Sequence, residues 1–245
     1  MNMMAYPGTV RLQAMLAAGG DVLKIQQDLA AKRSNLVAEL LRGEEDFFEQ
    51  QHYPAGDVFD PQTGAQYYYH AHRNDGREHG HFHIFQRPQF LGEHFEPAKY
   101  VKTGVGRCSP KQKIGEHWPR GEKALAHIVG VAMDHYGQPI RLFTVNRWVT
   151  DETWFAARDV IAMLERFELR HAWPSSPVNR WLNGLLRLFQ PEIIELIRRR
   201  DDAVEARGRA NPRGDALEDR SLEVTASIDI SVERQLRQLR RSLAA

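Results

Sequence analysis

Histidine is the residue type whose spacing suggests chemistry in this sequence. Five of the eleven histidines lie close together, at His70, His72, His79, His81 and His83. Imidazole nitrogens bind zinc, iron, copper and nickel, and they also exchange protons near neutral pH. The cluster therefore predicts a metal site, a group of acid–base or substrate-binding side chains, or simply a polar face.

The sequence around these histidines is typical of a β-hairpin. Residues 66–72 and 79–85 are rich in strand-forming aromatic residues, and Asp75-Gly76 between them is a strong turn signal. An even loop around this turn would pair His72 with His79, His70 with His81 and Tyr68 with His83. Because side chains alternate along a strand, all five histidines would then share one face. Directly opposed Cβ atoms lie about 4.5–5.5 Å apart, so two or three imidazoles can converge on one ion.

This geometry leads to a specific hypothesis about the site. We predict a divalent transition metal (zinc, iron or copper), with His70, His72, His79, His81 and His83 as candidate ligands. The candidate catalytic residues are Tyr68 and His83, deeper in the predicted sheet, and Arg147, which could line a cleft. A carboxylate would complete a set of two histidines and one acid, and the candidates are Glu78, Glu93 and Glu116.

The elements around the hairpin indicate the fold class. Grouped strands and grouped helices favour an α+β fold with an antiparallel sheet. We expect residues 1–245 to form a single domain in which two hairpins and a C-terminal strand make the sheet, packed by N-terminal and C-terminal helices. The predicted segments are helical 1–43, a punctuated loop 44–65, hairpin 66–85, basic loop 87–123, hairpin 124–149, helices 155–206, and a strand and helix within 222–243.

Composition excludes several classes of protein. Lys and Arg number 33 and Asp and Glu 32, so overall charge does not indicate a polyanionic partner. The single cysteine, Cys108, excludes an internal disulfide framework and a cysteine-rich zinc site. Without a secretory signal or a membrane-length apolar run, we expect a cytoplasmic protein. We expect a small-molecule substrate as partner, and neither nucleic acid nor membrane; the oligomeric state stays open.

Four long phrases in the sequence resemble those of a known family. They span residues 52–72, 78–88, 137–154 and 177–191. On these phrases the chain resembles an uncharacterised bacterial family, a domain of unknown function that covers most of the chain, and the resemblance implies no activity. Our leading hypothesis from the residues is a metal-dependent enzyme, a hydrolase or an oxidoreductase, acting on a small, anionic substrate. The alternative is a non-catalytic module that binds a ligand or a protein through the same histidine and tyrosine face.

Overall fold

The sheet is an antiparallel meander whose strand order follows the chain. The computed structural model describes residues 8–44, 46–71, 76–98, 115 and 117–244. Within these residues six strands pair in the order β1-β2-β3-β4-β5-β6. Their bounds are Tyr53–Phe59, Ala65–His70, Gly80–Gln86, Ala126–Met133, Pro139–Val145 and Val224–Asp229. The predicted α+β class is confirmed, with both expected hairpins and the C-terminal strand in one sheet.

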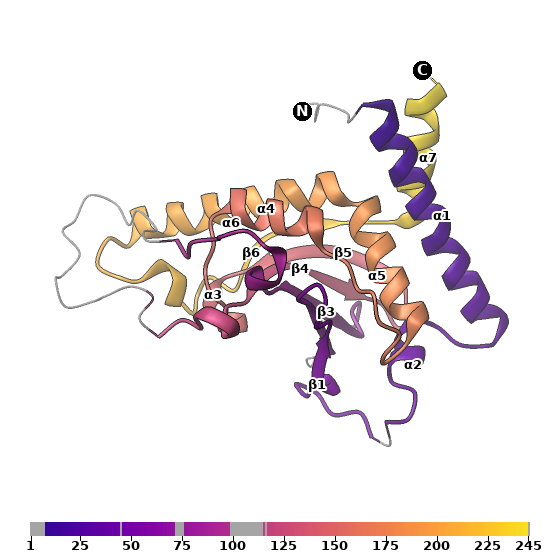
Figure 1. Cartoon of the computed structure of the whole chain (residues 1–245), viewed down its shortest axis with the longest axis horizontal. Helices are drawn as coiled ribbons and strands as arrows, with labels where there is room; N and C mark the ends of the chain where they lie inside the picture. The colour runs from indigo at the N-terminus through magenta and orange to yellow at the C-terminus, as the bar shows by residue number, and fades with distance from the viewer. Residues whose placement is uncertain (1–7, 45, 72–75, 99–114, 116, 245) are drawn as a thin grey trace.

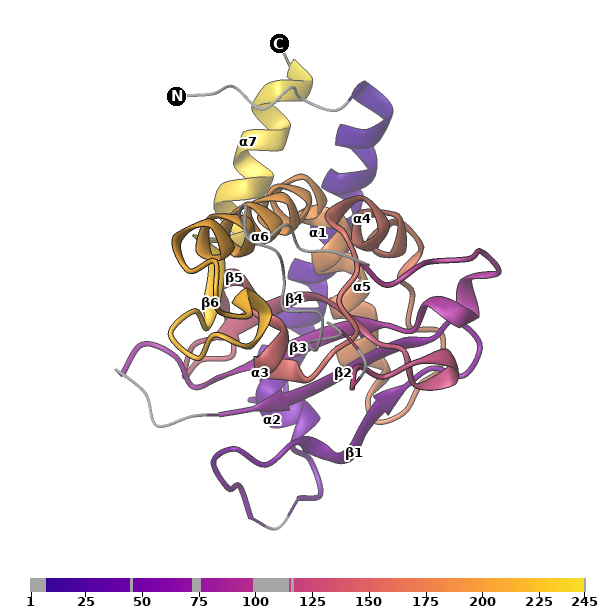
Figure 2. The same cartoon turned by 90° about the vertical axis from the view of Figure 1, so that its left-hand side faces the viewer.

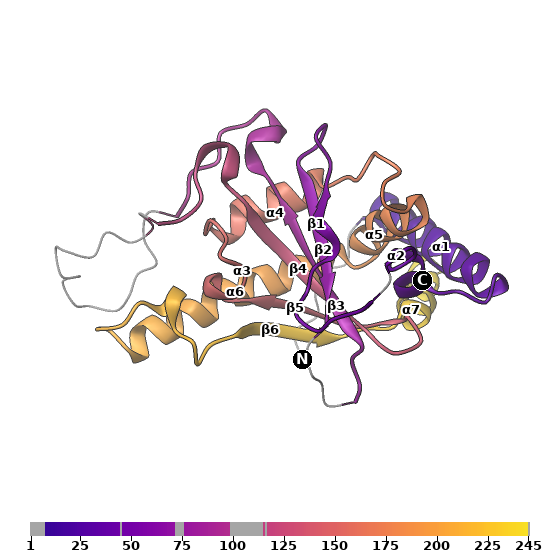
Figure 3. The same ribbon diagram turned by 90° about the horizontal axis from the view of Figure 1, so that it is seen from below.

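One face of the sheet is covered by helices from the C-terminal half of the chain. These helices are α4 (Ala157–Arg166), α5 (Ser176–Leu188) and α6 (Gln190–Ala210). In Figure 1, α4 and α6 lie above the strands and α5 descends beside them. The view in Figure 2 likewise shows α4 and α6 above the sheet. Seen from below, the strands lie in front of α4 and α6 (Figure 3). The sheet therefore has one face packed against helices and a second face pointing away from them.

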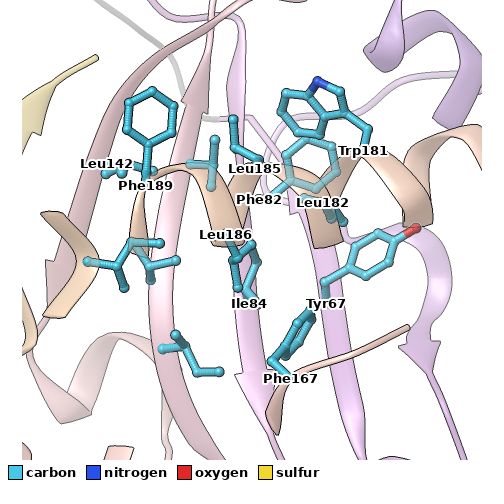
Figure 4. Close-up of a cluster of buried hydrophobic side chains, with 14 of the residues drawn as sticks. Tyr67, Phe82, Ile84, Leu142, Phe167, Trp181, Leu182, Leu185, Leu186 and Phe189 are labelled. Atoms are coloured by element: carbon cyan, nitrogen blue, oxygen red, sulfur yellow. The ribbon is translucent and has the colours of Figure 1, made fainter. Parts of the chain in front are cut away.

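The core forms where alternating strand residues meet α5. Tyr67, Phe82 and Ile84 are fully buried and point toward Trp181 and its helical neighbours (Figure 4). The Tyr67 hydroxyl donates a hydrogen bond to Asn179 Oδ1 over 2.8 Å, which satisfies a buried polar group. Since these residues occupy one face of β2 and β3, their neighbours along each strand must occupy the other.

The terminal helices pack beside this layer. The long helix α1 (Thr9–Ala31) lies along α5 and along α7 (Val232–Ala244), and α2 (Leu36–Leu40) follows it (Figure 1). Small residues permit the close approach: a Cβ on Gly184 would lie 2.9 Å from Val22 Cγ2. None of the helices in the described part of the chain is long and apolar enough to cross a membrane.

Three predicted segments differ in detail from the structure. The helical segment 1–43 contains two helices, α1 and α2, with a break at Arg33, whose φ is +56°. The expected loop 44–65 contains β1, whose pairing with β2 shifts register between Tyr53 and Val58. This shift breaks the alternation by which a strand is recognised. The expected loop 87–123 includes the short 3-10 helices Pro88–Leu91 and Gly121–Lys123, while its residues 99–114 and 116 lie outside the described part.

Two short helical segments lie in the connections next to β5 and β6. Helix α3 (Arg147–Thr150) follows β5 directly, and a 3-10 helix, Ala216–Glu218, precedes β6. The Asn146 side chain caps α3 by accepting from the Arg147 N–H. Residues 151–156 then lead from α3 to the helical layer, which brings Glu152 close to β4.

Candidate metal centre

Three histidines meet on the sheet face that points away from the helices. His70 ends β2, and His81 and His83 lie two residues apart on β3. The observed register pairs His70 with His81 and Tyr68 with His83, as the even hairpin loop predicts. Alternation along β3 then places both of its histidines beside His70. Each of the three can offer a ring nitrogen, and these nitrogens all lie within 4.8 Å of one another.

The distances within this His triad (His70, His81 and His83) suit a small cation. His70 Nε2 and His81 Nε2 are 2.7 Å apart, so one of them must donate a proton to the other when no metal is bound. Zn–N bonds of about 2.0–2.1 Å would hold two ligand nitrogens roughly 3 Å apart. A metal could therefore replace the shared proton after a small movement of the rings. All three side chains are buried, with exposed fractions of 9%, 7% and 2%.

Glu78 orients one member of the triad. Its carboxylate accepts a hydrogen bond from His81 Nδ1 and, through the other oxygen, one from Arg141 Nη2 over 2.8 Å. Burial opposes ionisation of this carboxyl, but the hydrogen bonds and charges of His81 and Arg141 outweigh it and lower the Glu78 pKa. With its Nδ1 proton held in this way, His81 presents a bare Nε2 to the centre. This is the usual arrangement of a carboxylate behind a metal-bound histidine.

His127 supports the triad from β4. Its Nε2 lies 3.0 Å from His83 Nδ1. The pairing of β3 with β4 shifts between Ile84 and Phe85, so that Ile84 pairs with Val129 but Phe85 pairs with His127. The extra residue on β4 turns His127 onto the histidine face, whereas strict alternation would place it with Val129 on the helical side. The periodicity of the β4 sequence does not predict this bulge, because it depends on how β4 pairs with β3.

Both buried histidines of this pair favour the neutral form. Burial, together with the charges of Arg200 and His81, lowers the pKa of His127 to about 3. Burial and the surrounding histidines place the His83 pKa well below its usual value. Metal ligation requires neutral imidazole, so His83 meets this requirement at neutral pH.

Glu152 anchors the main chain of His127. Its Oε2 accepts the His127 backbone N–H, and its side chain is fully buried. Burial raises the Glu152 pKa to about 7, against opposing contributions from Arg200, this hydrogen bond and Arg147. No spacing in the sequence links Glu152 to the hairpin, because the contact depends on how the chain returns past β4.

A phenylalanine from β5 forms one wall of the site. The Phe143 ring packs edge-on to His81, with ring centroids 5.2 Å apart. It fits there because its partner in the register is Gly130: a Cβ at this position would lie 2.3 Å from Phe143 Cζ. Arg141 lies over the same ring, 5.1 Å from its centroid, and its side chain is 34% exposed. The glycine and the guanidinium thus shape the edge of the triad.

Tyr68, a predicted catalytic residue, lies directly beside the triad. Its ring centroid is 5.3 Å from those of His70 and His83. The His52 ring stacks on it at 3.6 Å, and His52 Nδ1 lies 3.0 Å from Asp57 Oδ1. Burial raises the Tyr68 pKa above its usual value, so its hydroxyl stays protonated at neutral pH. At neutral pH the Tyr68 hydroxyl is therefore a hydrogen-bond donor and not a phenolate.

The structure does not bring His79 into the triad. His79 precedes the first residue of β3, so strand alternation does not direct its side chain. Its Nδ1 lies 2.8 Å from the Tyr69 hydroxyl, and its ring stacks against Phe47. His72 lies outside the described residues.

Arg147 and Glu93, two further candidates, lie in other networks. Arg147 is buried, and its guanidinium donates to Glu218, to Asp151 and to the Glu152 carbonyl. Glu93 pairs with Arg166 at the surface. Glu116 lies outside the described residues.

A cavity of about 520 Å³ lies apart from the triad. It is lined by parts of the predicted basic loop, including Phe95, Trp118 and Arg120, and by Thr153 and Phe155. None of the triad histidines lines it, so the cavity and the histidine face are separate features of the described structure.

Comparison with known proteins agrees with the resemblance seen in the sequence. A family model described as "Domain of unknown function (DUF6969)" matches residues 16–230, most of the chain. Neither a curated protein nor a solved structure matches this chain. The chain therefore belongs to the DUF6969 family, and its histidine triad lies within the matched region.

Proposed function

We propose that this protein binds one divalent transition metal ion through His70, His81 and His83. The observation that supports the proposal is the convergence of three buried imidazoles, one of them held by a carboxylate. One cation would accept a lone pair from each of the three rings, since each can offer a nitrogen to the same point. Zinc, iron and copper are the metals suited to such a set of nitrogen ligands.

We further propose that the metal centre is catalytic and acts on a small, anionic substrate. Three protein ligands leave a coordination position open, where a bound metal would activate water or polarise a substrate. Arg141 supports an anionic substrate, because its partly exposed guanidinium lies at the edge of the triad. The Tyr68 ring lies against those of His70 and His83, and we propose that its hydroxyl donates a hydrogen bond to a group held there. The second candidate is a non-catalytic binding module that uses the same face, favoured by the low exposure of the triad.

Metal content and affinity test the first proposal. We expect the wild-type chain to bind one equivalent of Zn²⁺ by elemental analysis and calorimetry, and His70→Ala, His81→Ala and His83→Ala each to lose binding. His135→Ala, in the exposed turn after β4, is the matched control and should bind like the wild type. At one hundred times its dissociation constant, Zn²⁺ should stabilise the wild type by about 2.7 kcal/mol in thermal unfolding. Absence of metal under every loading condition, or equal binding by the triad variants, would overturn the proposal.

An anion probe separates the two functional candidates. Cobalt(II) bound in place of zinc reports its coordination through its visible absorption. If a position is open, millimolar azide should change that spectrum, and Arg141→Ala should weaken the azide effect. A spectrum that azide leaves unchanged would refute the catalytic proposal and favour the binding module.

A further inference from the structure

His127 and Glu152 belong to no sequence motif. His127 contacts the triad at His83, and Glu152 contacts the main chain of His127. His127 is 1% exposed and Glu152 is fully buried, so both polar side chains are removed from water. The β-bulge at Ile128 turns His127 toward His83, and Glu152 Oε2 accepts the His127 main-chain N–H. Burial of a polar side chain is unfavourable unless its polar atoms find hydrogen-bond partners.

The contact between the two histidines limits the tautomers of His83. Only one of His83 Nδ1 and His127 Nε2, 3.0 Å apart, can carry the shared proton. If His127 donates, neutral His83 carries its own proton on Nε2 and cannot bind a metal through that atom. If His83 donates, its Nε2 is bare and free to bind a cation. The described structure contains a buried atom without a partner, His127 Nδ1, which shows that other contacts do not hold this ring's tautomer.

We propose that His127 is a positioning residue for the metal centre: it accepts the Nδ1 proton of His83 and so directs His83 Nε2 at the metal. Glu152 acts one step further out by holding the main chain of His127 at the bulge. The inference rests on the proposed metal site and adds a residue to it. It assigns His83 the same kind of support that Glu78 provides for His81, with a neutral ring in place of a carboxylate.

A pair of substitutions separates this role from a structural one. His127→Phe keeps an aromatic ring beside Phe85 but removes the acceptor, whereas His127→Gln places an amide oxygen close to the position of Nε2. In the full-length protein we expect His127→Phe to weaken Zn²⁺ binding by about 10–100-fold and His127→Gln to restore most of the loss. His135→Phe is the control for introducing the ring, and circular dichroism confirms that each variant is folded.

The tautomer of His83 is a readout that packing alone would not change. In the metal-free proteins, nitrogen-15 spectra of the imidazoles should show the Nδ1–H form of His83 in the wild type and in His127→Gln, and a mixture of forms in His127→Phe. Zinc affinity and tautomer unchanged in His127→Phe would overturn the inference while leaving the metal site intact. Equal loss of affinity in a folded His127→Gln would also overturn it, because a hydrogen-bond acceptor at this position would then not restore binding. A wild type that binds no zinc would overturn the proposed function and this inference together.

Discussion

The carboxyl group of Glu152 should make the stability of this protein depend on pH in an unusual direction. Burial raises its pKa from the usual 4.5 to about 7, so folding favours the protonated form. Its contribution to stability is fully present below pH 4.5 and is lost as the pH rises through 7. At 1.36 kcal/mol for each pH unit, the difference corresponds to about 3 kcal/mol in the free energy of unfolding. A carboxyl group in an ion pair has a lowered pKa, so its contribution to stability is lost as the pH falls, which is the opposite direction.

Glu152→Gln isolates this effect. The amide oxygen can still accept the His127 N–H, but the side chain no longer ionises. Urea unfolding of both proteins, with chelator present, should be measured between about pH 4 and about pH 8. The wild type should lose about 3 kcal/mol relative to the variant as the pH rises, while contributions from the histidines cancel in the comparison. Parallel pH profiles for the two proteins would refute the reasoning, because they would show that Glu152 does not change its protonation in this range.

Three further substitutions test the supports of the site and the core. Glu78→Gln should weaken metal binding about 10–100-fold by calorimetry, since the charge behind His81 is lost; unchanged affinity would contradict that role. Gly130→Ala should lower the free energy of unfolding by about 1–3 kcal/mol, because the new methyl displaces the Phe143 ring. A variant with the same urea midpoint as the wild type would show that the ring moves at no cost. Arg200→Met should cost about 1–3 kcal/mol in urea unfolding, since it leaves the buried Phe155 carbonyl without its donor; equal stability would show that another group replaces it.

The local pattern of the sequence was sufficient to predict the centre of the histidine site. Alternation along two strands and an even loop predict which residues face each other, and both properties depend only on neighbours in the chain. The pairs His70–His81 and Tyr68–His83 are those observed. The α+β class follows in the same way from the grouping of strand and helix patterns, and the family resemblance is confirmed over residues 16–230.

Only the tertiary structure decided which other residues join that centre. His79 lies one residue before β3 begins, and a strand boundary is set by pairing with its neighbours. His127 reaches His83 through a bulge that exists only where β4 pairs with β3. Glu152 contacts the His127 main chain because the segment that follows α3 lies beside β4. Strand pairing, β-bulges and contacts between distant segments depend on residues far apart in the sequence. The periodicity within one segment therefore does not predict them.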